Sequence, residues 1–316
     1  MTGITIHSTQ EPVSLRLYRD DDDFWRVRNL LIETYPITSP DFNWDVRRWD
    51  GSRFHNKEAV WSPYWEGRVG PWETEDGRLV GAVHPEGEGM AFLEIHPDYR
   101  HVEEEMIAWA ESHLAKATAD GSQRQLTMFV YEYDAWRRHL LQQRGFQKTD
   151  DAPVIRRLRF GNKVLPPVEM SKGYTLRTAR SDDEDEHQRF AALLNAAFNR
   201  TFHNAQEIAT FRATAPSYRA DLDLFAEAPD GSLAANVGVI YVEAIQAGLY
   251  EPVCTHPDHR RKGLARALMW EGMHRLKALG ATEVTVGTGD MVPANRLYES
   301  VGFPEVYKGY HWRKVW

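Results

Sequence analysis

One stretch of the chain joins basic side chains, a glycine and the start of a helix. Residues 256–268 read HPDHRRKGLARAL, and an alanine- and leucine-rich helix is predicted after Gly263. The basic residues before this glycine are Arg260, Arg261 and Lys262. A helix N-terminus exposes unpaired N–H groups and carries partial positive charge, and a glycine lets a ligand approach closely. The pattern predicts a pyrophosphate site, although most basic runs on helices are only solvated faces.

The segment before this turn, LYEPVCT at 249–255, is typical of a strand. Pro252 has no N–H and would interrupt the hydrogen bonds of a strand paired on both sides. We therefore expect the strand to separate from one neighbour there, leaving backbone groups free for an extended amide ligand. Alternate side chains share a face, so Glu251 and Val253 point one way. Cys254 points the other way, where a core thiol is expected rather than a nucleophile.

The chain contains two copies of one pattern. His-Pro-Asp triplets begin at residues 96 and 256, and Gly-Phe pairs begin at 145 and 302. An acidic cluster and a hairpin turn also recur in the same order. We predict two domains of one kind, 1–163 and 164–316. They meet around residues 161–173, where glycines and paired prolines suit a linker.

Each copy predicts the same succession of elements. A strand is followed by a helix with an acidic start, a hairpin turned by Asp-Gly, the His-Pro-Asp segment and a long helix. A further strand, a short helix ending in Gly-Phe and a final strand complete the copy. Because strands and helices mix without strict alternation, we expect an α/β or α+β class. Each domain would hold a mixed, mostly antiparallel sheet flanked by helices.

Composition limits the partners and the location. The chain has 316 residues, a net charge of −8 and one cysteine, Cys254. One cysteine excludes an internal disulfide framework and a cysteine-based zinc cluster, and we expect no metal. The acidic balance argues against nucleic acid. The absence of a long apolar run or a signal-like start predicts no membrane contact and a cytoplasmic location. The sequence does not determine the oligomeric state.

Two motifs resemble those of the GNAT superfamily of acyl-CoA N-acyltransferases. RRKGLA at 260–265 is similar to the family's Arg/Gln-x-x-Gly-x-Gly/Ala signature, and NRLYESVGF at 295–303 is similar to its closing helix and Gly-Phe pair. The resemblance covers the second copy and, more faintly, the first. The tandem arrangement is similar to that of mycothiol synthase and related double-GNAT proteins. It implies two GNAT-like domains, of which the second uses acetyl-CoA as acyl donor without a metal.

The resemblance also implies roles for single residues. Backbone groups of Val253 and Thr255 would pair with pantetheine, and an N–H near Val253 would stabilise the oxyanion that forms at the thioester. The amides from Arg261 to Ala265 would hold the pyrophosphate. The residues expected to bind CoA are Val253, Cys254, Thr255, Arg260, Arg261, Lys262, Gly263, Leu264, Ala265, Asn295 and Tyr298.

Two residues are candidates for proton transfer. Tyr298 stands where GNAT enzymes often place the acid that protonates the departing CoA thiolate; the alternative is an aromatic packed on the sheet. Glu251, two residues from the expected oxyanion site, is the best candidate for the base; the alternatives are a solvated carboxylate or a salt bridge. Asn295 lies one turn before Tyr298 on the same face. Many relatives place the CoA-contacting Asn seven residues before the Tyr, where this chain has Met291.

The first copy keeps the architecture and loses these features. Glu103, Glu104 and Glu105 stand where the second copy has its glycine turn, and three carboxylates would repel pyrophosphate. Leu141 replaces Tyr298. We expect this degenerate domain to bind no CoA productively and to serve as a scaffold or as one wall of the substrate cleft. An aromatic-rich insertion would form that wall or would simply pack in the core. Its aromatic residues are Trp44, Trp49, Trp61, Tyr64, Trp65 and Trp72.

Together these patterns predict an N-acyltransferase. The enzyme would pass an acyl group, most plausibly acetyl, from acyl-CoA to a primary amine of a small molecule by direct attack in a ternary complex. One alternative is a non-catalytic acyl-CoA-binding sensor or scaffold. Another is acetylation of a peptide or protein amine, for which an open groove is expected.

Overall fold

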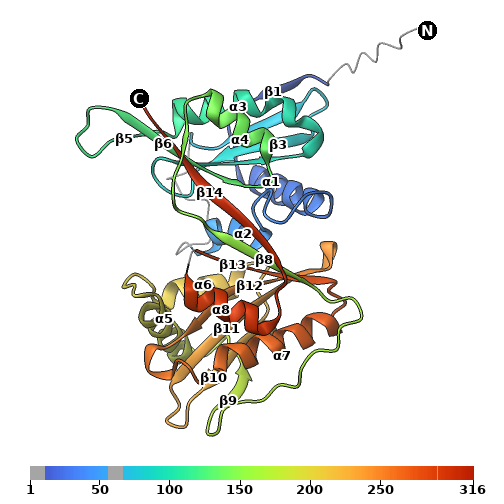
Figure 1. Ribbon diagram of the computed structural model, residues 1–316, viewed down its shortest axis with the longest axis vertical. Helices are drawn as coiled ribbons and strands as arrows, with labels where there is room; N and C mark the ends of the chain where they lie inside the picture. The colour runs from blue at the N-terminus through green and yellow to red at the C-terminus, as the bar shows by residue number, and fades with distance from the viewer. Residues whose placement is uncertain (1–10, 56–66, 290) are drawn as a thin grey trace.

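The computed structural model describes residues 11–55, 67–289 and 291–316. The chain forms two lobes, with the N-terminal half above and most of the C-terminal half below (Figure 1). Trp61, Tyr64 and Trp65 of the aromatic-rich insertion lie outside the described residues. Within the described part, no helix combines the length and apolar character needed to cross a bilayer.

The N-terminal half carries the predicted order of elements. Its helices are α1 (Asp21–Thr34), α2 (Val46–Phe54), α3 (Glu103–His113) and α4 (Ala135–Gln143), with short 3-10 turns at Tyr35–Ile37 and Pro97–Val102. Its strands are β1 (Val13–Leu15), β2 (Gly70–Thr74), β3 (Leu79–His84), β4 (Met90–Ile95), β5 (Lys116–Ala117), β6 (Arg124–Tyr131), β7 (Gln147–Lys148) and β8 (Val154–Arg159).

The C-terminal half repeats that order. Its helices are α5 (Glu184–Phe198), α6 (Ala205–Thr214), α7 (Leu264–Ala278) and α8 (Val292–Val301), with 3-10 turns at Ala220–Leu222, Glu243–Ile245 and Pro257–His259. Its strands are β9 (Thr175–Thr178), β10 (Asp223–Glu227), β11 (Leu233–Val242), β12 (Ala247–Thr255), β13 (Glu283–Thr288) and β14 (Glu305–Val315). The predicted mixed class and the tandem arrangement are confirmed.

The two halves exchange their last strands. The strand order is β1-β2-β3-β4-β6-β14-β8-β13-β12-β11-β10-β9. β14 pairs with β8 over Glu305–Lys308 and with β6 over Gly309–Val315. β8 pairs with β13 along its whole length. The predicted boundary at residues 163 and 164 falls in the coil between β8 and β9, while the sheet itself continues across the two lobes.

The acidic clusters cap helices, as the sequence indicated. The Asp20 carboxylate accepts the Asp22 N–H at the start of α1, and Asp183 accepts the Glu186 N–H at the start of α5. These carboxylates satisfy N–H groups that the helix leaves unpaired and lie at the positive end of its dipole. They account for the acidic runs without a metal.

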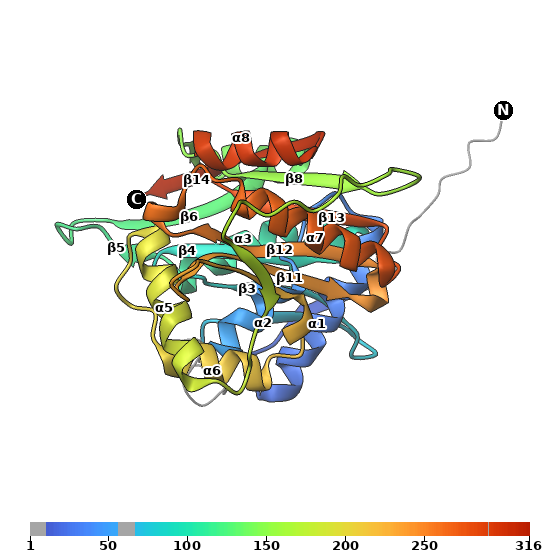
Figure 2. The same ribbon diagram turned by 90° about the horizontal axis from the view of Figure 1, so that it is seen from below.

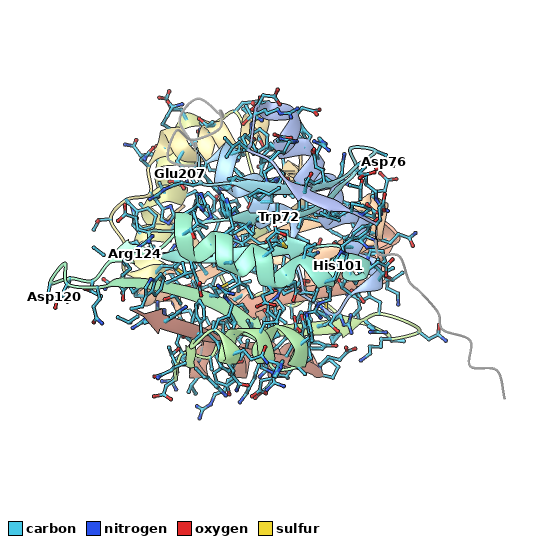
Figure 3. All side chains as sticks on the ribbon, turned by 90° about the horizontal axis from the view of Figure 1, so that it is seen from above. Trp72, Asp76, His101, Asp120, Arg124 and Glu207 are labelled. Atoms are coloured by element: carbon cyan, nitrogen blue, oxygen red, sulfur yellow. The ribbon has the colours of Figure 1, made fainter. Side chains whose placement is uncertain are left out.

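Apolar clusters hold the helices against the faces of the sheet and so position the strands that carry the site. Below, α7 and α8 cover one face of the strands, and α5 and α6 lie on the other (Figure 2). Above, Trp72 lies between the strands and α3 (Figure 3) and is fully buried. A third cluster joins the lobes, because Phe24 and Trp49 pack in it with Phe211 of α6. The helices α2 and α6 are therefore held together across the interface.

Candidate active site

β12 separates from β13 at the predicted proline. The two strands pair in parallel only over Ala247–Tyr250, yet β12 continues to Thr255 and β13 to Thr288. On its other side β12 stays paired with β11, with a bulge between Val237 and Val239. A Cβ on Gly238 would collide with the carbonyl oxygen of Glu251, so this bulge needs a glycine. The predicted gap is confirmed.

The backbone parity of β12 shows which groups face the gap. The His256 N–H donates to the Ala234 carbonyl of β11 at 2.9 Å. Because successive N–H groups of a strand point to opposite sides, Cys254 also faces β11, whereas Val253 and Thr255 face away from it. The free backbone of these two residues lies where the sequence predicted a bound amide chain.

A cavity of about 840 Å³ lies between the lobes and reaches this gap. Glu251, Val253 and Tyr298 line it from the lower lobe, and Arg47 and Gly51 of α2 line it from the upper lobe. The structure thus brings the two predicted proton-transfer residues to one space beside the free strand edge. The participation of α2 makes the N-terminal half a wall of that space.

Tyr298 fits both of its sequence interpretations. Its ring packs near Phe303, with 6.2 Å between centroids, and the side chain is only 4% exposed. Its hydroxyl has no hydrogen-bond partner among the described residues, while the residue lines the cavity. Burial, reinforced by the Glu251 carboxylate, raises the Tyr298 pKa well above its ordinary value. The phenol therefore stays protonated at neutral pH and is free to donate.

Glu251 has no ion-pair or hydrogen-bond partner among the described residues, so the predicted alternative of a salt bridge does not apply. The residue is exposed and lines the cavity. Burial within the protein raises the pKa of Glu251, and the nearby Arg47, Arg48 and Arg200 lower it again in part. A carboxylate of this kind is a better base than one in bulk water.

The glycine turn leaves its N–H groups free. Arg261 and Gly263 adopt left-handed φ angles of 64° and 72°. The backbone amides from Arg261 to Ala265 donate to no described protein acceptor, and no side chain caps α7. Carbonyl and side-chain contacts hold the turn instead: the Ser171 hydroxyl donates to the Lys262 carbonyl at 2.6 Å. Consecutive free amides in this conformation form an anion-binding concavity.

Side chains around the turn have separate partners. The Arg260 guanidinium donates to the Ala197 carbonyl at 3.0 Å, and the Lys262 ammonium donates to the Tyr174 hydroxyl at 2.6 Å. Arg261 is exposed and has no described partner. Leu264 and Ala265 are buried beneath the turn. Arg261 is thus the basic side chain most available to a ligand.

Asn295 and Cys254 have mainly structural surroundings. The Asn295 amide donates to the Met291 carbonyl at 3.1 Å and accepts from the Arg156 guanidinium of β8 at 3.1 Å. Its role with CoA stays a prediction, whereas Met291 does line the cavity. Cys254 packs in a core cluster, and burial raises its thiol pKa to about 12, as expected of a core thiol. Because its side chain is in the core, Cys254 would lie near CoA only through its position on β12 between Val253 and Thr255.

The first copy has the same gap, and its own side chains fill it. β4 pairs with β6 only at Met90 and Ala91. Beyond that point the Asn43 side chain bonds both backbone groups of Ile95, and Arg137 donates to the Leu93 carbonyl at 3.4 Å. A cavity of only about 40 Å³ remains.

The helix start of the first copy is closed as well. Glu103, at the position of Gly263, is fully buried and accepts from Arg100 and Arg137 at 2.9 and 3.0 Å. His101, labelled in Figure 3, lies in the 3-10 turn that leads into this helix. Sequence reasoning found the glutamates but missed Asn43 and Arg137, whose partners are distant in the chain.

Comparison with known proteins agrees with this geometry. Residues 191–303 match the acetyltransferase (GNAT) family. No curated protein matches the chain. A GCN5-related N-acetyltransferase from Sphaerobacter thermophilus superposes with a TM-score of 0.65 at 17% identity, over 96% of this chain and 95% of that one. A tandem GNAT protein from the clavulanic acid biosynthesis pathway gives 0.64 at 18%, over 96% and 98%.

A GNAT-family acetyltransferase from Colwellia psychrerythraea gives a TM-score of 0.61 at 12% identity, over 95% of this chain and 100% of that one. At such identities these structures show the fold, which extends over both lobes. Residues 191–303 therefore match the acetyltransferase (GNAT) family, and the fold of GNAT proteins, a tandem one among them, extends along the length of the chain.

Proposed function

We propose that the protein transfers an acyl group, most simply acetyl, from acyl-CoA to a primary amine of a small molecule. One observation carries the proposal: a single cavity contains a carboxylate with a raised pKa, an unpaired phenol and a free strand edge. These groups are Glu251, Tyr298 and the backbone of Val253. Family membership of residues 191–303 supports the reaction class.

The donor would lie along the gap between β12 and β13. Its pantetheine amides would pair with Val253 and Thr255, as an added strand does. Its pyrophosphate would bind the free amides from Arg261 to Ala265, assisted by the Arg261 guanidinium. The thioester then points into the cavity between the lobes.

The chemistry follows from the groups that surround the thioester. The acceptor ammonium gives a proton to Glu251, and the neutral amine attacks the thioester carbonyl carbon to form the C–N bond. The N–H near Val253 stabilises the resulting oxyanion. Collapse breaks the C–S bond, and the Tyr298 phenol protonates the leaving thiolate. As the amide forms, its nitrogen releases a second proton to solvent. Solvent also takes the proton from Glu251 and returns one to Tyr298, and the products are the N-acyl amine and CoA.

We assign this reaction to the domain 164–316, and to the domain 1–163 the role of a wall without its own CoA. The filled gap at Asn43 and the ion-paired Glu103 support this division. The position of this space between the two lobes favours a small acceptor over a protein chain. Arg47 and Gly51 of the first domain line the space in which the acceptor would bind.

Calorimetry with acetyl-CoA tests the donor site. The wild type should bind one equivalent, and Gly263→Glu should abolish binding because a side chain strains the left-handed turn and a carboxylate repels pyrophosphate. Glu105→Ala, at the matching exposed turn of the first domain, should bind normally. Absence of binding to the wild type would overturn the proposal. Binding without thiol release in the presence of any amine would indicate a non-catalytic acyl-CoA-binding module instead.

A further inference from the structure

Most charged side chains of the cavity wall already have partners. The ion pairs are Arg48 with Glu86, Arg212 with Asp223, and Arg219 with Asp221, and the Glu207 carboxylate contacts the imidazole rings of His55 and His203. Among the described residues of the wall, Arg47 and Arg200 have no carboxylate within 4 Å, and Glu251 has neither a cation nor a hydrogen-bond donor. The cavity thus presents two guanidinium groups without a carboxylate partner and one carboxylate without any partner.

Neutral groups hold Arg47 in its position. Its guanidinium lies 5.1 Å from the centroid of the Phe211 ring, and one nitrogen lies 3.2 Å from Nε2 of His55. The His55 ring is itself stacked on Phe211, and burial lowers its pKa. A neutral His55 accepts from Arg47 through Nε2, with Nδ1 3.3 Å from Glu207 of the adjoining α6 (Figure 3). No contact removes the charge of Arg47.

The local sequence makes room for this guanidinium. Gly51 follows Arg47 by about one helical turn, and a Cβ there would lie 3.2 Å from an Arg47 terminal nitrogen. A glycine inside a helix costs about 1 kcal/mol relative to alanine. The Nε atom of Arg47 is buried without a hydrogen-bond partner. A rigid, incompletely bonded guanidinium at a cavity wall is suited to an incoming acceptor of hydrogen bonds.

Arg200 completes the arrangement from the lower lobe. Its guanidinium lies 5.0 and 5.4 Å from the rings of Phe198 and Phe202, again without a carboxylate partner. Arg47 and Arg200 both act electrostatically on Glu251. All three residues line the same cavity.

We infer that the acceptor is a primary amine that also carries an oxyanion, either a carboxylate or a phosphate, which Arg47 and Arg200 bind while Glu251 receives the amine. A molecule with both groups offers a partner to each of these three side chains, and guanidinium groups match the geometry of either oxyanion. The inference rests on the proposed function and makes Arg47 a residue through which the N-terminal domain determines acceptor specificity.

Inorganic phosphate tests the subsite without turnover. The protein is first saturated with CoA, so that the glycine turn is occupied, and the thermal unfolding midpoint is followed as phosphate is added. Phosphate should raise the midpoint of the wild type and of Arg275→Gln, an arginine of α7 paired with Glu271 outside the cavity. The double variant Arg47→Gln/Arg200→Gln should lose this increment. An equal response in the double variant overturns the inference.

Matched acceptors test specificity by thiol release. The panel pairs amino acids with their amides and glucosamine 6-phosphate with glucosamine, and it includes a polyamine. Acetylation should be confined to members with an oxyanion, and Arg47→Gln should raise their KM about tenfold or more, or about 1.4 kcal/mol, with a smaller effect on kcat. A preference for amino acids indicates that the oxyanion is a carboxylate, and a preference for glucosamine 6-phosphate indicates that it is a phosphate.

The outcomes separate this inference from the proposed function. Faster acetylation of amides or of the polyamine, or an unchanged KM in Arg47→Gln, overturns the inference while the acyltransfer function stands. Failure of CoA to bind overturns the proposed function and with it the inference. Where no member of the panel is acetylated, the phosphate titration of the CoA-bound protein still decides whether the subsite exists.

Discussion

The side-chain amide of Asn43 donates to the backbone carbonyl of Ile95 at 3.0 Å and accepts from the N–H of the same residue at 2.9 Å. Ile95 precedes its His-Pro-Asp triplet as Thr255 precedes the second one. In the second copy the equivalent backbone faces an open gap. A side-chain amide of the first domain thus occupies the place proposed for a pantetheine amide in the second.

Asn43→Ala should therefore lower the stability of the protein. Asn43 is buried, and its loss leaves two backbone groups of Ile95 without partners, at a cost of about 2–4 kcal/mol. Urea unfolding measures the difference. Thr34→Val, which removes another partner of Asn43 and leaves the bonds to Ile95 intact, is the control and should cost less. Equal losses in the two variants would contradict the role given to Asn43.

Glu103→Gln tests how firmly the helix start of the first copy is closed. The substitution leaves Arg100 and Arg137 with a neutral partner in a buried place, and removal of one member of a buried ion pair costs about 3–5 kcal/mol. Glu104→Gln, on the exposed side of the same turn, should cost less than about 1 kcal/mol. Acetyl-CoA affinity should stay unchanged in both. Equal stability of the two variants in urea would show that the pairs are dispensable.

The sequence predicted the succession of elements and the convergence of Glu251 and Tyr298 on one cavity better than the pairing between the halves. Repeated landmarks define each copy, and strand parity places Glu251 beside the proposed oxyanion site. The alternation of side chains along a strand does not show which half of the sheet the last strand of a copy joins, because β8 and β14 have equivalent positions in their copies. Asn43 and Arg47 were missed for a related reason. Their roles depend on contacts with Ile95 and with α6, which no local pattern reveals.

The strand exchange predicts that the second domain is incomplete by itself. A fragment of residues 164–316 loses β8 from the edge of β13 and leaves Gly309–Val315 without β6. Unpaired edges promote association between chains. This fragment should form oligomers or aggregates in size-exclusion chromatography, and a fragment of residues 152–316, which restores β8, should do so less. A monomeric 164–316 fragment with the thermal stability of the longer one would refute this expectation.

Tyr298→Phe separates the catalytic interpretation of this residue from the structural one. The hydroxyl has no described partner, so the variant should keep its stability and its affinity for acetyl-CoA. Loss of the proton donor should lower kcat about 10²-fold. Tyr241→Phe is the control, because its hydroxyl donates to the Leu279 carbonyl at 2.9 Å outside the cavity. That variant should lose stability and keep kcat, and an unchanged kcat in Tyr298→Phe would leave only a packing role.

Glu251 should set the acidic limb of the activity profile. Burial raises its pKa above the ordinary 4.5, so kcat/KM should fall as pH drops through this raised pKa, nearer neutrality than for a solvated carboxyl. Glu251→Gln should have low activity without this limb.

The same shift fixes the sign of the effect of Glu251 on stability. A raised pKa in the folded state means that the stabilising contribution is present at acidic pH and is lost as pH rises through that pKa. Glu251→Gln, which cannot ionise, should therefore be more stable than the wild type at neutral pH and lose this advantage in acid. Glu305→Gln provides the opposite case, because a hydrogen bond from the Tyr307 hydroxyl and the paired Arg157 lower the pKa of Glu305 against the effect of burial. That variant should be destabilised at neutral pH and approach the wild type in acid. Urea unfolding at several pH values measures both, and a Glu251→Gln protein that is less stable than the wild type at neutral pH would show that the Glu251 carboxylate has a stabilising partner and is not held ready as a base.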